Sequence, residues 1–133
     1  MEDCIFCTIA KNKRAYMIYE DEQFLAFLDI FPVVLGHTLV VPKKHFRWVW
    51  DVENIDEYFQ VCQKIAKHMQ KTLGQELIIS LIFGEAVHHA HVHLVPGKTE
   101  IVQKMTAMER YKPSEAEFQE TVKKLSLNRS HVL

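Results

Sequence analysis

The sequence lacks a strong charge imbalance and has no long apolar run. Its 16 Lys and Arg residues nearly balance 17 Asp and Glu residues, and the formal net charge is -1. A chain without a global positive field is a poor non-specific binder of nucleic acid, so we expect no nucleic-acid partner. No apolar stretch approaches the roughly 18 residues of a membrane-spanning helix, so we also expect no membrane partner.

Cysteines are few, and a secretory leader is not evident. Two of the three cysteines, Cys4 and Cys7, have C-x2-C spacing, which makes no disulfide framework and is typical of a reducing compartment. The start, Met1 to Cys4, has neither a basic segment nor a long apolar one. We therefore expect a cytoplasmic protein. Repeats, low-complexity tracts and linkers are also lacking, and 48% hydrophobic residues in 133 predict one domain over residues 1–133.

Alternating and apolar segments predict five short strands. Period-2 patterns and bounding turn residues indicate the first three, a continuous apolar run indicates a buried fourth, and alternating histidines indicate the last. The predicted strands cover residues 16–20, 23–29, 37–41, 77–83 and 87–95.

A helical period replaces this alternation from Ile55 to Leu73. Asn54 and Glu57 form a possible capping pair, and Gly74 stands where a C-cap glycine belongs. The apolar arc of this helix is wide, which fits either deep burial within its own domain or burial against both a sheet and a partner subunit. The fold class we expect is α+β, with the helix packed on an antiparallel sheet.

The C-terminal part of the chain, residues 98–133, predicts a helical tail. Ser114 and Glu117 form a second capping pair ahead of an apolar stripe. Arg110 and Lys112 precede it and could reach a neighbouring phosphate, but we interpret both as solvated surface.

Three histidines at alternate positions, His89, His91 and His93, are the most informative pattern. Successive side chains of a β-strand point to opposite faces, so the three imidazoles would share one face while the apolar residues between them pack into the core. Imidazole titrates near neutral pH, acts as a nucleophile or proton carrier, and binds transition metals when neutral. This strand therefore predicts a functional site.

The run from His89 to Val95 resembles the His-φ-His-φ-His-φ-φ motif (φ, apolar) of the histidine-triad (HIT) superfamily. Asp29 to Pro32 and Gly36 to His45 resemble the first characteristic segment of that family, and Cys4 to Cys7 resembles its zinc-bearing branch. The resemblance covers roughly residues 4 to 96 and leaves the helical tail outside it.

The resemblance implies a hydrolase or nucleotidyl transferase that attacks the α-phosphate of a nucleotide conjugate. His91 matches the nucleophile that forms a covalent nucleotidyl-histidine, and His93 and His37 match histidines on the phosphate side. The candidate substrates are phosphoramidates, dinucleoside polyphosphates and adenylylated compounds. The family also implies a homodimer.

The resemblance further implies where a nucleoside binds. Asp29 matches a ribose ligand, because a carboxylate accepts hydrogen bonds from both hydroxyls of a diol. The apolar positions that match a base-binding slot are Phe6, Ile9, Phe27 and Ile30, and we expect a purine with weak base selectivity. Plain core packing explains Phe6, Ile9 and Phe27 equally well, and Asp29 could instead be a turn carboxylate.

Two residues before the triad depart from the family pattern. Glu85 stands where glutamine is common and Ala86 where a serine is found in the phosphoramidase branch. A carboxylate near phosphates is repulsive unless it is protonated, turned away or paired with a cation. The alternative function is therefore a non-catalytic, zinc-stabilised nucleotide-binding module, and a metal buffer is a third hypothesis.

The resemblance also implies one structural zinc ion per chain. Cys4 and Cys7 have the spacing that lets two thiolates reach one metal ion. In the zinc-bearing branch the other two ligands match His45 and His89, which would leave His89 unavailable to a phosphate. Otherwise both cysteines are small core residues of a short helix.

Overall fold

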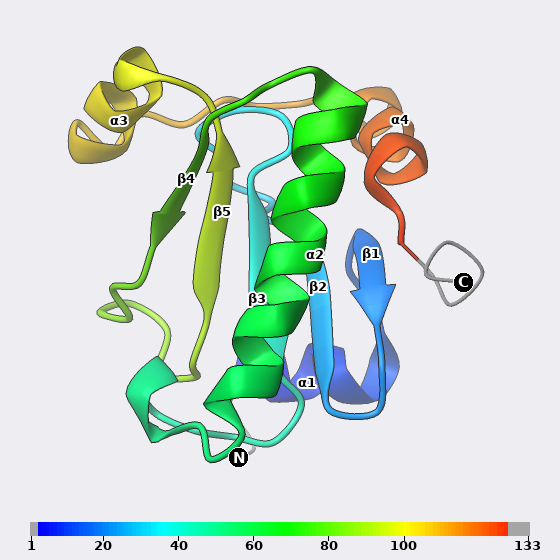
Figure 1. Ribbon diagram of the computed structural model, residues 1–133, viewed down its shortest axis with the longest axis vertical. Coiled ribbons are helices and arrows are strands. Elements are labelled where there is room, and N and C mark those ends of the chain that lie inside the picture. Colours follow the sequence, from blue (N-terminus) through cyan, green and yellow to red (C-terminus); the bar gives the residue numbers. More distant parts are fainter. Residues whose placement is uncertain (1–2, 128–133) are drawn as a thin grey trace.

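The computed structural model describes residues 3–127 and centres on a five-stranded antiparallel sheet. Its strand order is β1-β2-β3-β5-β4 (Figure 1), so β4 and β5 lie beside β3 although α2 separates them from it in the sequence. The strands are β1 Met17–Glu20, β2 Phe24–Leu28, β3 Thr38–Pro42, β4 Ile78–Leu81 and β5 Val92–Pro96. The predicted α+β class and antiparallel sheet are confirmed.

Helices cover the sheet on both faces. The long α2 crosses one face with α4 beside it, and α1 lies on the other side (Figure 1). The helices are α1 Ile5–Asn12, α2 Ile55–Leu73, α3 Thr99–Thr106 and α4 Glu115–Leu125, with a 3-10 turn at Val49–Asp51. Among the described helices, none has the length and apolar character needed to cross a membrane.

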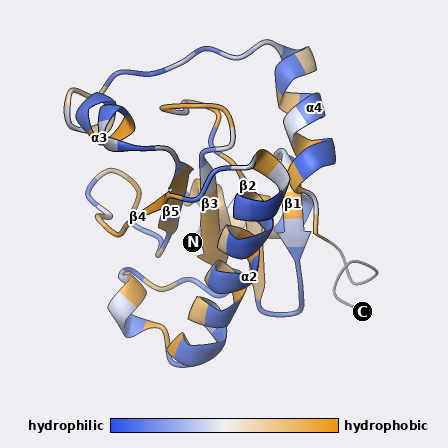
Figure 2. Cartoon of the chain, turned by 45° about the horizontal axis from the view of Figure 1, so that its top comes forward, coloured by the Kyte–Doolittle hydropathy of each residue, from blue (hydrophilic) through white to orange (hydrophobic). Residues whose placement is uncertain are grey.

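Strand β2 shows why both faces need cover. Phe24, Ala26 and Leu28 point into the cluster under α2, whereas Leu25 and Phe27 point into a second cluster under α1. Side chains of a strand alternate between faces, so a strand that is apolar at every position must be buried on both. Figure 2 shows the strands as the hydrophobic centre of the molecule.

Helix α2 has the bounds that its sequence period predicts. Its buried stripe lies against the sheet and consists of Tyr58, Val61, Cys62, Ile65 and Met69. Gly74 ends the helix in the left-handed conformation at φ 61°, as expected of a C-cap glycine. The predicted capping pair at its start is wrong. Asn54 makes no side-chain cap, because its amide donates to Gln23 Oε1 at 2.7 Å instead.

Two strand predictions need correction. The fourth strand was expected to be buried, but β4 is an edge strand whose Ser80 and Leu81 are exposed. The fifth was expected over residues 87–95, but β5 begins only at Val92. The backbone N–H of Ala90 donates to Phe46 O at 2.7 Å, so the chain before Val92 bonds to a loop rather than to a neighbouring strand.

The described part of the tail packs on the rest of the domain. Helix α4 begins with the predicted capping box of Ser114 and Glu117, and Phe118 stacks on Tyr16 with ring centroids 4.2 Å apart. Neither of the two predicted capping pairs lies at the start of helix α3. The linker between α3 and α4 crosses the end of the sheet (Figure 1), where Tyr111 N–H donates to Pro32 O at 2.7 Å.

Candidate functional site

The histidines implied as catalytic lie on the face of the sheet opposite α2. In β5, Val92 and Leu94 point into the α2 cluster, so His93 points to the other face. His93 pairs across the sheet with Leu39 of β3, which belongs to the α1 cluster. His37 immediately precedes β3, and its ring centroid lies 5.2 Å from that of His93. Residues distant in sequence thus form one histidine cluster.

Hydrogen bonds determine which nitrogens of His37 and His93 carry protons. The backbone N–H of Val33 donates to His37 Nδ1 at 3.1 Å, so this nitrogen is unprotonated and the proton of the neutral ring lies on Nε2. His37 Nε2 then donates to His93 Nδ1 at 2.9 Å. His93 therefore carries its own proton on Nε2, which leaves it able to donate a hydrogen bond to a ligand.

His91 has the opposite arrangement. Its Nδ1 lies 2.7 Å from the backbone oxygen of His89, and a carbonyl oxygen only accepts, so Nδ1 carries the proton. Nε2 of His91 therefore presents a lone pair. The ring centroids of His91 and His93 are 5.1 Å apart. A nucleophilic nitrogen and a hydrogen-bond donor thus stand side by side.

Burial keeps these rings neutral. It lowers the pKa of His37 and His91 below the ordinary value, against the opposing charge of Asp29. Burial lowers the pKa of His93 further, to about 3, with help from His37, His91 and Arg110. All three imidazoles are therefore uncharged near neutral pH, the state in which His91 can act as a nucleophile.

A second cluster joins Cys4 and Cys7 to His45 and His89, whose ligand atoms all lie within 4.8 Å of one another. Cys4 Sγ lies 3.2 Å from His89 Nδ1, and Cys7 Sγ lies 3.3 Å from His45 Nδ1 and 3.4 Å from His89 Nδ1. In a tetrahedral zinc site with ordinary bond lengths, sulfur and nitrogen ligands stand about 3.6 Å apart. The cluster is therefore close to the size of a zinc site.

His89 is also oriented as a metal ligand would be. Its Nε2 lies 2.8 Å from Pro42 O, which must accept the proton of that nitrogen. Nδ1 therefore directs its lone pair at the cysteines, as happens when a backbone carbonyl orients a metal-binding histidine. The donor set, two sulfurs and two imidazole nitrogens, fits a structural zinc ion.

The triad histidines share one face, as alternation predicts, because Ala90, Val92 and Leu94 all point into the α2 cluster, but the strand is shorter than expected. Of the three, only His93 lies in β5, and His89 turns toward His45, with ring centroids 4.9 Å apart. The physical reason is the loop bonding of Ala90, which ends the strand before it reaches His91. The triad is therefore divided between the metal cluster and the histidine cluster.

The apolar residues expected to hold a base have unequal exposure. Phe6, Ile9 and Phe27 are buried in the α1 cluster, which agrees with a packing role. Phe6 also borders the histidine cluster, with its ring centroid 5.2 Å from that of His91. Ile30 is 57% exposed and therefore accessible to a ligand. Asp29 lies beside it in the sequence.

Asp29 connects the loop after β2 to the histidine cluster. Its Oδ1 accepts the backbone N–H of Phe31 at 2.8 Å, and its Oδ2 lies 3.5 Å from His37 Nε2. The carboxylate thus closes a turn, as the alternative interpretation holds, and also lies near the phosphate-side histidines. Its side chain is 17% exposed, which leaves one edge open to a ligand.

The segment before the triad is anchored by a residue that the sequence did not single out. Arg47 donates from Nη1 to Gly84 O at 2.9 Å, and its guanidinium lies 3.6 Å from the ring centroid of Trp48. Glu85 and Ala86, which follow Gly84, are exposed. Arg47 lies two residues after the predicted metal ligand His45, and this closeness in sequence is the signal that could have indicated it.

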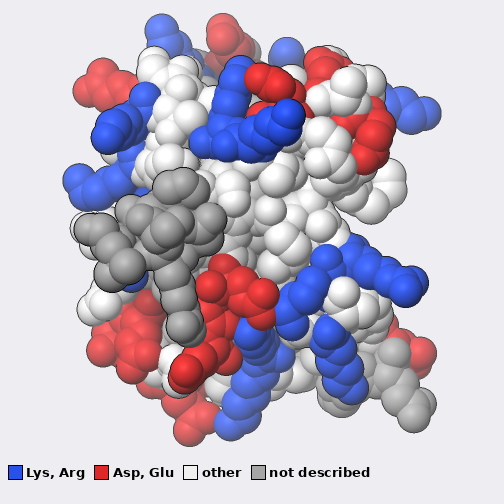
Figure 3. Space-filling model, turned by 90° about the vertical axis from the view of Figure 1, so that its right-hand side faces the viewer, with Lys and Arg blue, Asp and Glu red and all other residues white. Residues whose placement is uncertain are grey.

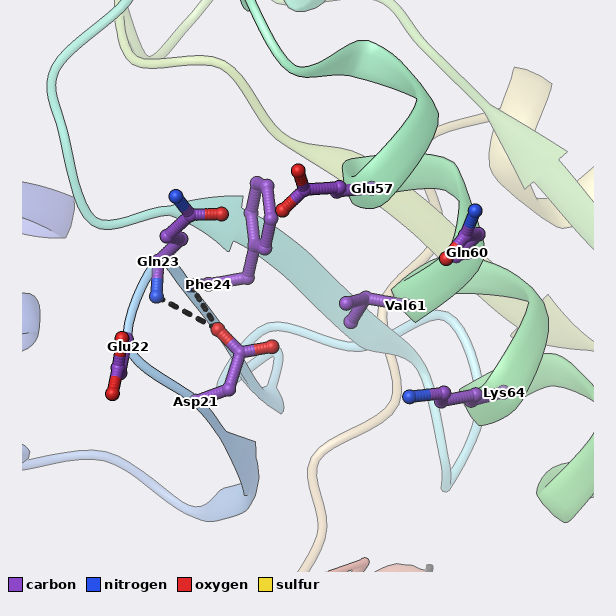
Figure 4. A pocket seen from close by; sticks show the side chains of 8 residues that line it. All are labelled: Asp21, Glu22, Gln23, Phe24, Glu57, Gln60, Val61 and Lys64. Carbon is purple, nitrogen blue, oxygen red and sulfur yellow. Dashed lines mark hydrogen bonds between the residues drawn. The ribbon is translucent and has the colours of Figure 1, made fainter.

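A surface pocket lies away from both clusters. Figure 4 shows it between the β1–β2 turn and α2, with a volume of about 330 Å³. Asp21 Oδ1 accepts the backbone N–H groups of Gln23 and Phe24 there, each at 2.8 Å. It contains none of the predicted site residues, because those lie on the opposite face of the sheet.

These features, an open antiparallel sheet with a divided histidine triad beside a Cys2His2 cluster, define a histidine-triad class of protein. The HIT domain family matches residues 10–100, and the chain belongs to this family. An uncharacterized HIT-like protein of Borreliella burgdorferi is 39% identical over 109 residues, which cover 72% of this chain and 76% of the relative.

Solved structures agree with this assignment. A hypothetical histidine triad nucleotide-binding protein from Sulfolobus tokodaii is 29% identical, with a TM-score of 0.78 over 92% of this chain and 89% of its own. A zinc-bound histidine triad family protein from Mycobacterium smegmatis is 31% identical, with a TM-score of 0.71 over 93% and 94%. A HIT family hydrolase from Clostridium thermocellum is 30% identical, with a TM-score of 0.63 over 74% and 94%.

Proposed function

We propose that the protein is a nucleotide hydrolase or nucleotidyl transferase that acts through a covalent nucleotidyl-histidine. The observation that carries this proposal is the complementary protonation of two adjacent rings: His91 Nε2 presents a lone pair while His93 Nε2 carries a proton. A phosphoryl group bound between them would meet a nucleophile and a hydrogen-bond donor at once. The family match and the structurally similar hydrolase support the same activity.

In the proposed reaction, His91 Nε2 attacks the α-phosphorus. The new N–P bond forms as the bond to the leaving group breaks, and the leaving group takes that electron pair. His93 Nε2–H donates to a phosphoryl oxygen as negative charge develops there, and His37 keeps His93 in the donating tautomer. Water then opens the N–P bond, which releases the nucleoside monophosphate and restores the lone pair of His91.

The same proposal assigns the nucleoside to the region beside the histidine cluster. Asp29 binds the ribose hydroxyls, and the base, a purine, lies against the exposed Ile30. The border of this region comprises the other residues assigned to substrate binding, namely Phe6, Ile9, Phe27 and Glu85. Phe6 supports this placement, because it contacts the α1 cluster and His91 together.

We propose that Cys4, Cys7, His45 and His89 hold one structural zinc ion per chain. The ligand-atom spacing, the orientation of His89 by Pro42 and the zinc-bound relative support this assignment. Zinc there would supply only a tetrahedral cross-link, because all four positions are taken by protein ligands. The cross-link would tie α1 and the His45 segment to the chain that carries His91.

We propose a homodimer that uses the edge of the sheet at β4. The strand order leaves one side of β4 without a described neighbour, and the apolar side chains Leu77 and Leu81 are 50% and 37% exposed there. An exposed apolar edge strand favours pairing with a second copy.

The test is release of adenosine monophosphate from adenosine phosphoramidate and from diadenosine tetraphosphate by the wild type and by His91→Ala. We expect the substitution to reduce kcat by about a thousandfold or more, because it removes the nucleophile. His68→Ala is the matched control, since His68 lies on α2 at the opposite face and should leave the rate unchanged.

A second outcome identifies the alternative function. If the wild type binds adenosine monophosphate but releases none from either substrate, the protein is a zinc-stabilised binding module and the proposed catalysis is wrong. Glu85→Gln and Ala86→Ser, which restore the family pattern, would then be the first substitutions to test for activity.

A further inference from the structure

Arg47 places a fixed positive charge at one side of the histidine cluster. Phe46 O accepts the N–H of Ala90, which lies between His89 and His91, so Arg47 directly follows a residue bonded to the triad segment. Its own bond to Gly84 and its stacking on Trp48 hold the guanidinium in place. The bond to Gly84 uses one of five N–H donors, so most of the donors of this side chain can serve a ligand.

A second arginine, Arg110, adjoins a residue that is tied to the loop beside the histidine cluster. Tyr111 N–H donates to Pro32 O at 2.7 Å, which ties the α3–α4 linker to the loop whose Val33 N–H orients His37. Arg110 is adjacent to this tie, and its charge is among the causes that lower the pKa of both His37 and His93. Arg110 is exposed, as the sequence analysis expects, and its charge nevertheless acts on the histidine cluster.

We propose that Arg47 and Arg110 bind the anionic part of the substrate beyond the attacked phosphorus, so that the site selects nucleotide conjugates whose leaving group carries phosphate. This inference rests on the proposed function and specifies its substrate class. Guanidinium groups bind phosphate oxygens through paired, charge-assisted hydrogen bonds, which an uncharged or cationic leaving group cannot accept.

The charge of Arg47 also offsets the repulsion that the Glu85 carboxylate would exert on bound phosphates. A carboxylate beside bound phosphates raises their energy unless a cation offsets it. Arg47 binds the residue that precedes Glu85 in the chain, so a positive charge is fixed in the same segment. One serine of the phosphoramidase branch is replaced by Ala86, which has no hydroxyl to assist an amine leaving group. The absence of this hydroxyl disfavours an amine leaving group, and the Arg47 charge offsets the repulsion between Glu85 and an anionic one.

The first measurement is the calorimetric affinity of the full chain for adenosine monophosphate, diphosphate and triphosphate. We expect the triphosphate to bind at least about tenfold more tightly than the monophosphate, because each extra phosphate gains a charge-assisted contact. Arg47→Gln and Arg110→Gln should each remove most of this gain while leaving monophosphate affinity within about threefold. Arg47→Lys keeps the charge and should retain part of the gain.

Arg14→Gln is the matched control. Arg14 is exposed and lies between α1 and β1, and its backbone N–H donates to Asn12 Oδ1. The substitution therefore removes the same charge without changing the site. An equal loss in Arg14→Gln would overturn the inference, since the effect would then reflect net charge alone. Equal affinity of the wild type for all three nucleotides would also overturn it.

The second measurement is kcat/KM for diadenosine tetraphosphate and for adenosine phosphoramidate. Each arginine substitution should lower the first by about tenfold or more and the second by less than about threefold. Equal losses on both substrates would overturn the inference and leave the proposed function intact. A wild type that turns over neither substrate but shows the predicted nucleotide affinities would overturn the catalysis and support the anion site.

Discussion

One backbone N–H, that of Val33, determines which nitrogens of His37 and His93 carry protons. By donating to His37 Nδ1 it moves the proton of His37 to Nε2, and the bond from there to His93 moves the proton of His93 to its own Nε2. His37 is buried and His93 is half-buried, so water has limited access to these two rings. The tautomer of His93, the proposed phosphate donor, is therefore set by Val33 through His37.

His93 should make stability depend on pH. Its folded pKa is about 3 against an ordinary value of 6.5, so between these values the unfolded state binds more protons than the folded state. The free energy of unfolding should fall as pH falls through this range, by up to about 1.4 kcal/mol per pH unit from this group. At pH above 6.5 both states are neutral and the contribution vanishes.

Urea unfolding of the wild type and of His93→Gln at about pH 7.5, where the group contributes nothing, and at steps down to about pH 4.5 checks the prediction. The substitution should flatten the pH dependence. Parallel curves for the two proteins would show that His93 is not buried as a neutral ring.

Helix α1 is held in place by His89, which is distant from it in the sequence, and by the sheet. Its N-cap residue, Cys4, accepts a hydrogen bond from the backbone N–H of Cys7 and also lies against His89. With only Phe6 and Ile9 of its own residues buried, this helix of 8 residues has a small apolar contact with the sheet. A short helix of this kind is marginal without further tethering.

Removal of the metal cluster should therefore destabilise the protein. Protein purified without chelator should contain about one zinc per chain by metal analysis, and Cys4→Ala should lose the metal and lower the melting temperature. Cys62→Ala is the control, because Cys62 lies on the buried face of α2, away from the metal ligands, so this variant should lose stability while keeping its zinc. A zinc-free wild type would contradict the assignment.

Helix α4 has a separate source of stability. Ser114 Oγ accepts the backbone N–H of Glu117 at 3.1 Å, and Glu117 Oε1 accepts the backbone N–H of Ser114 at 2.9 Å. Ser114→Ala removes the first bond and should cost about 1 kcal/mol in the free energy of unfolding. Chemical denaturation measures this value, and a change below about 0.3 kcal/mol would show that α4 is held by packing alone.

The two faces of the sheet differ in what covers them. Helices α2 and α4 cover one face, and the opposite face holds α1, the metal cluster and the histidine cluster. Viewed from the α4 side, Lys and Arg lie among Asp and Glu around an uncharged band (Figure 3). Neither sign dominates that face, which agrees with the near-zero net charge.

Assembly should use the β4 edge. Leu81→Lys would place a charge in the proposed interface, so we expect sedimentation to show a dimer for the wild type and a shift to monomer for the variant. Met108→Lys is the control, because Met108 is more exposed, at 73%, and lies in the tail. A monomeric wild type, or equal behaviour of the two variants, would contradict the proposed dimer.

Much of this architecture could be predicted from local pattern. The period of Ile55–Leu73 depends only on which side chains share a helix face, and the structure has a helix with those bounds. The capping box at Ser114 and the glycine C-cap at Gly74 are also local, because each satisfies backbone groups within one turn. The family resemblance rests on short motifs of the same kind, and it is confirmed.

Long-range contacts account for the predictions that are wrong. Asn54 could cap its own helix, but Gln23 offers its side chain a partner from another part of the chain. Residues 89–91 alternate as a strand does, but the backbone N–H of Ala90 donates to Phe46 O, so this segment does not join the predicted fifth strand. Neither competing partner is visible in the local sequence.

The amino-acid sequence by itself therefore determined the family, the fold class and the residue types of the candidate site, because periodicity and motif spacing express local geometry. A cytoplasmic location stays a prediction from cysteine use. Only the tertiary structure decided that His89 faces the cysteines, that Val33 orients His37, and that Arg47 bonds to the segment before the triad. His89 and Cys4, like Arg47 and Gly84, are tens of positions apart in the sequence, and Val33 reaches His37 only through the turn between β2 and β3, so these contacts exist only once the chain has packed around its sheet.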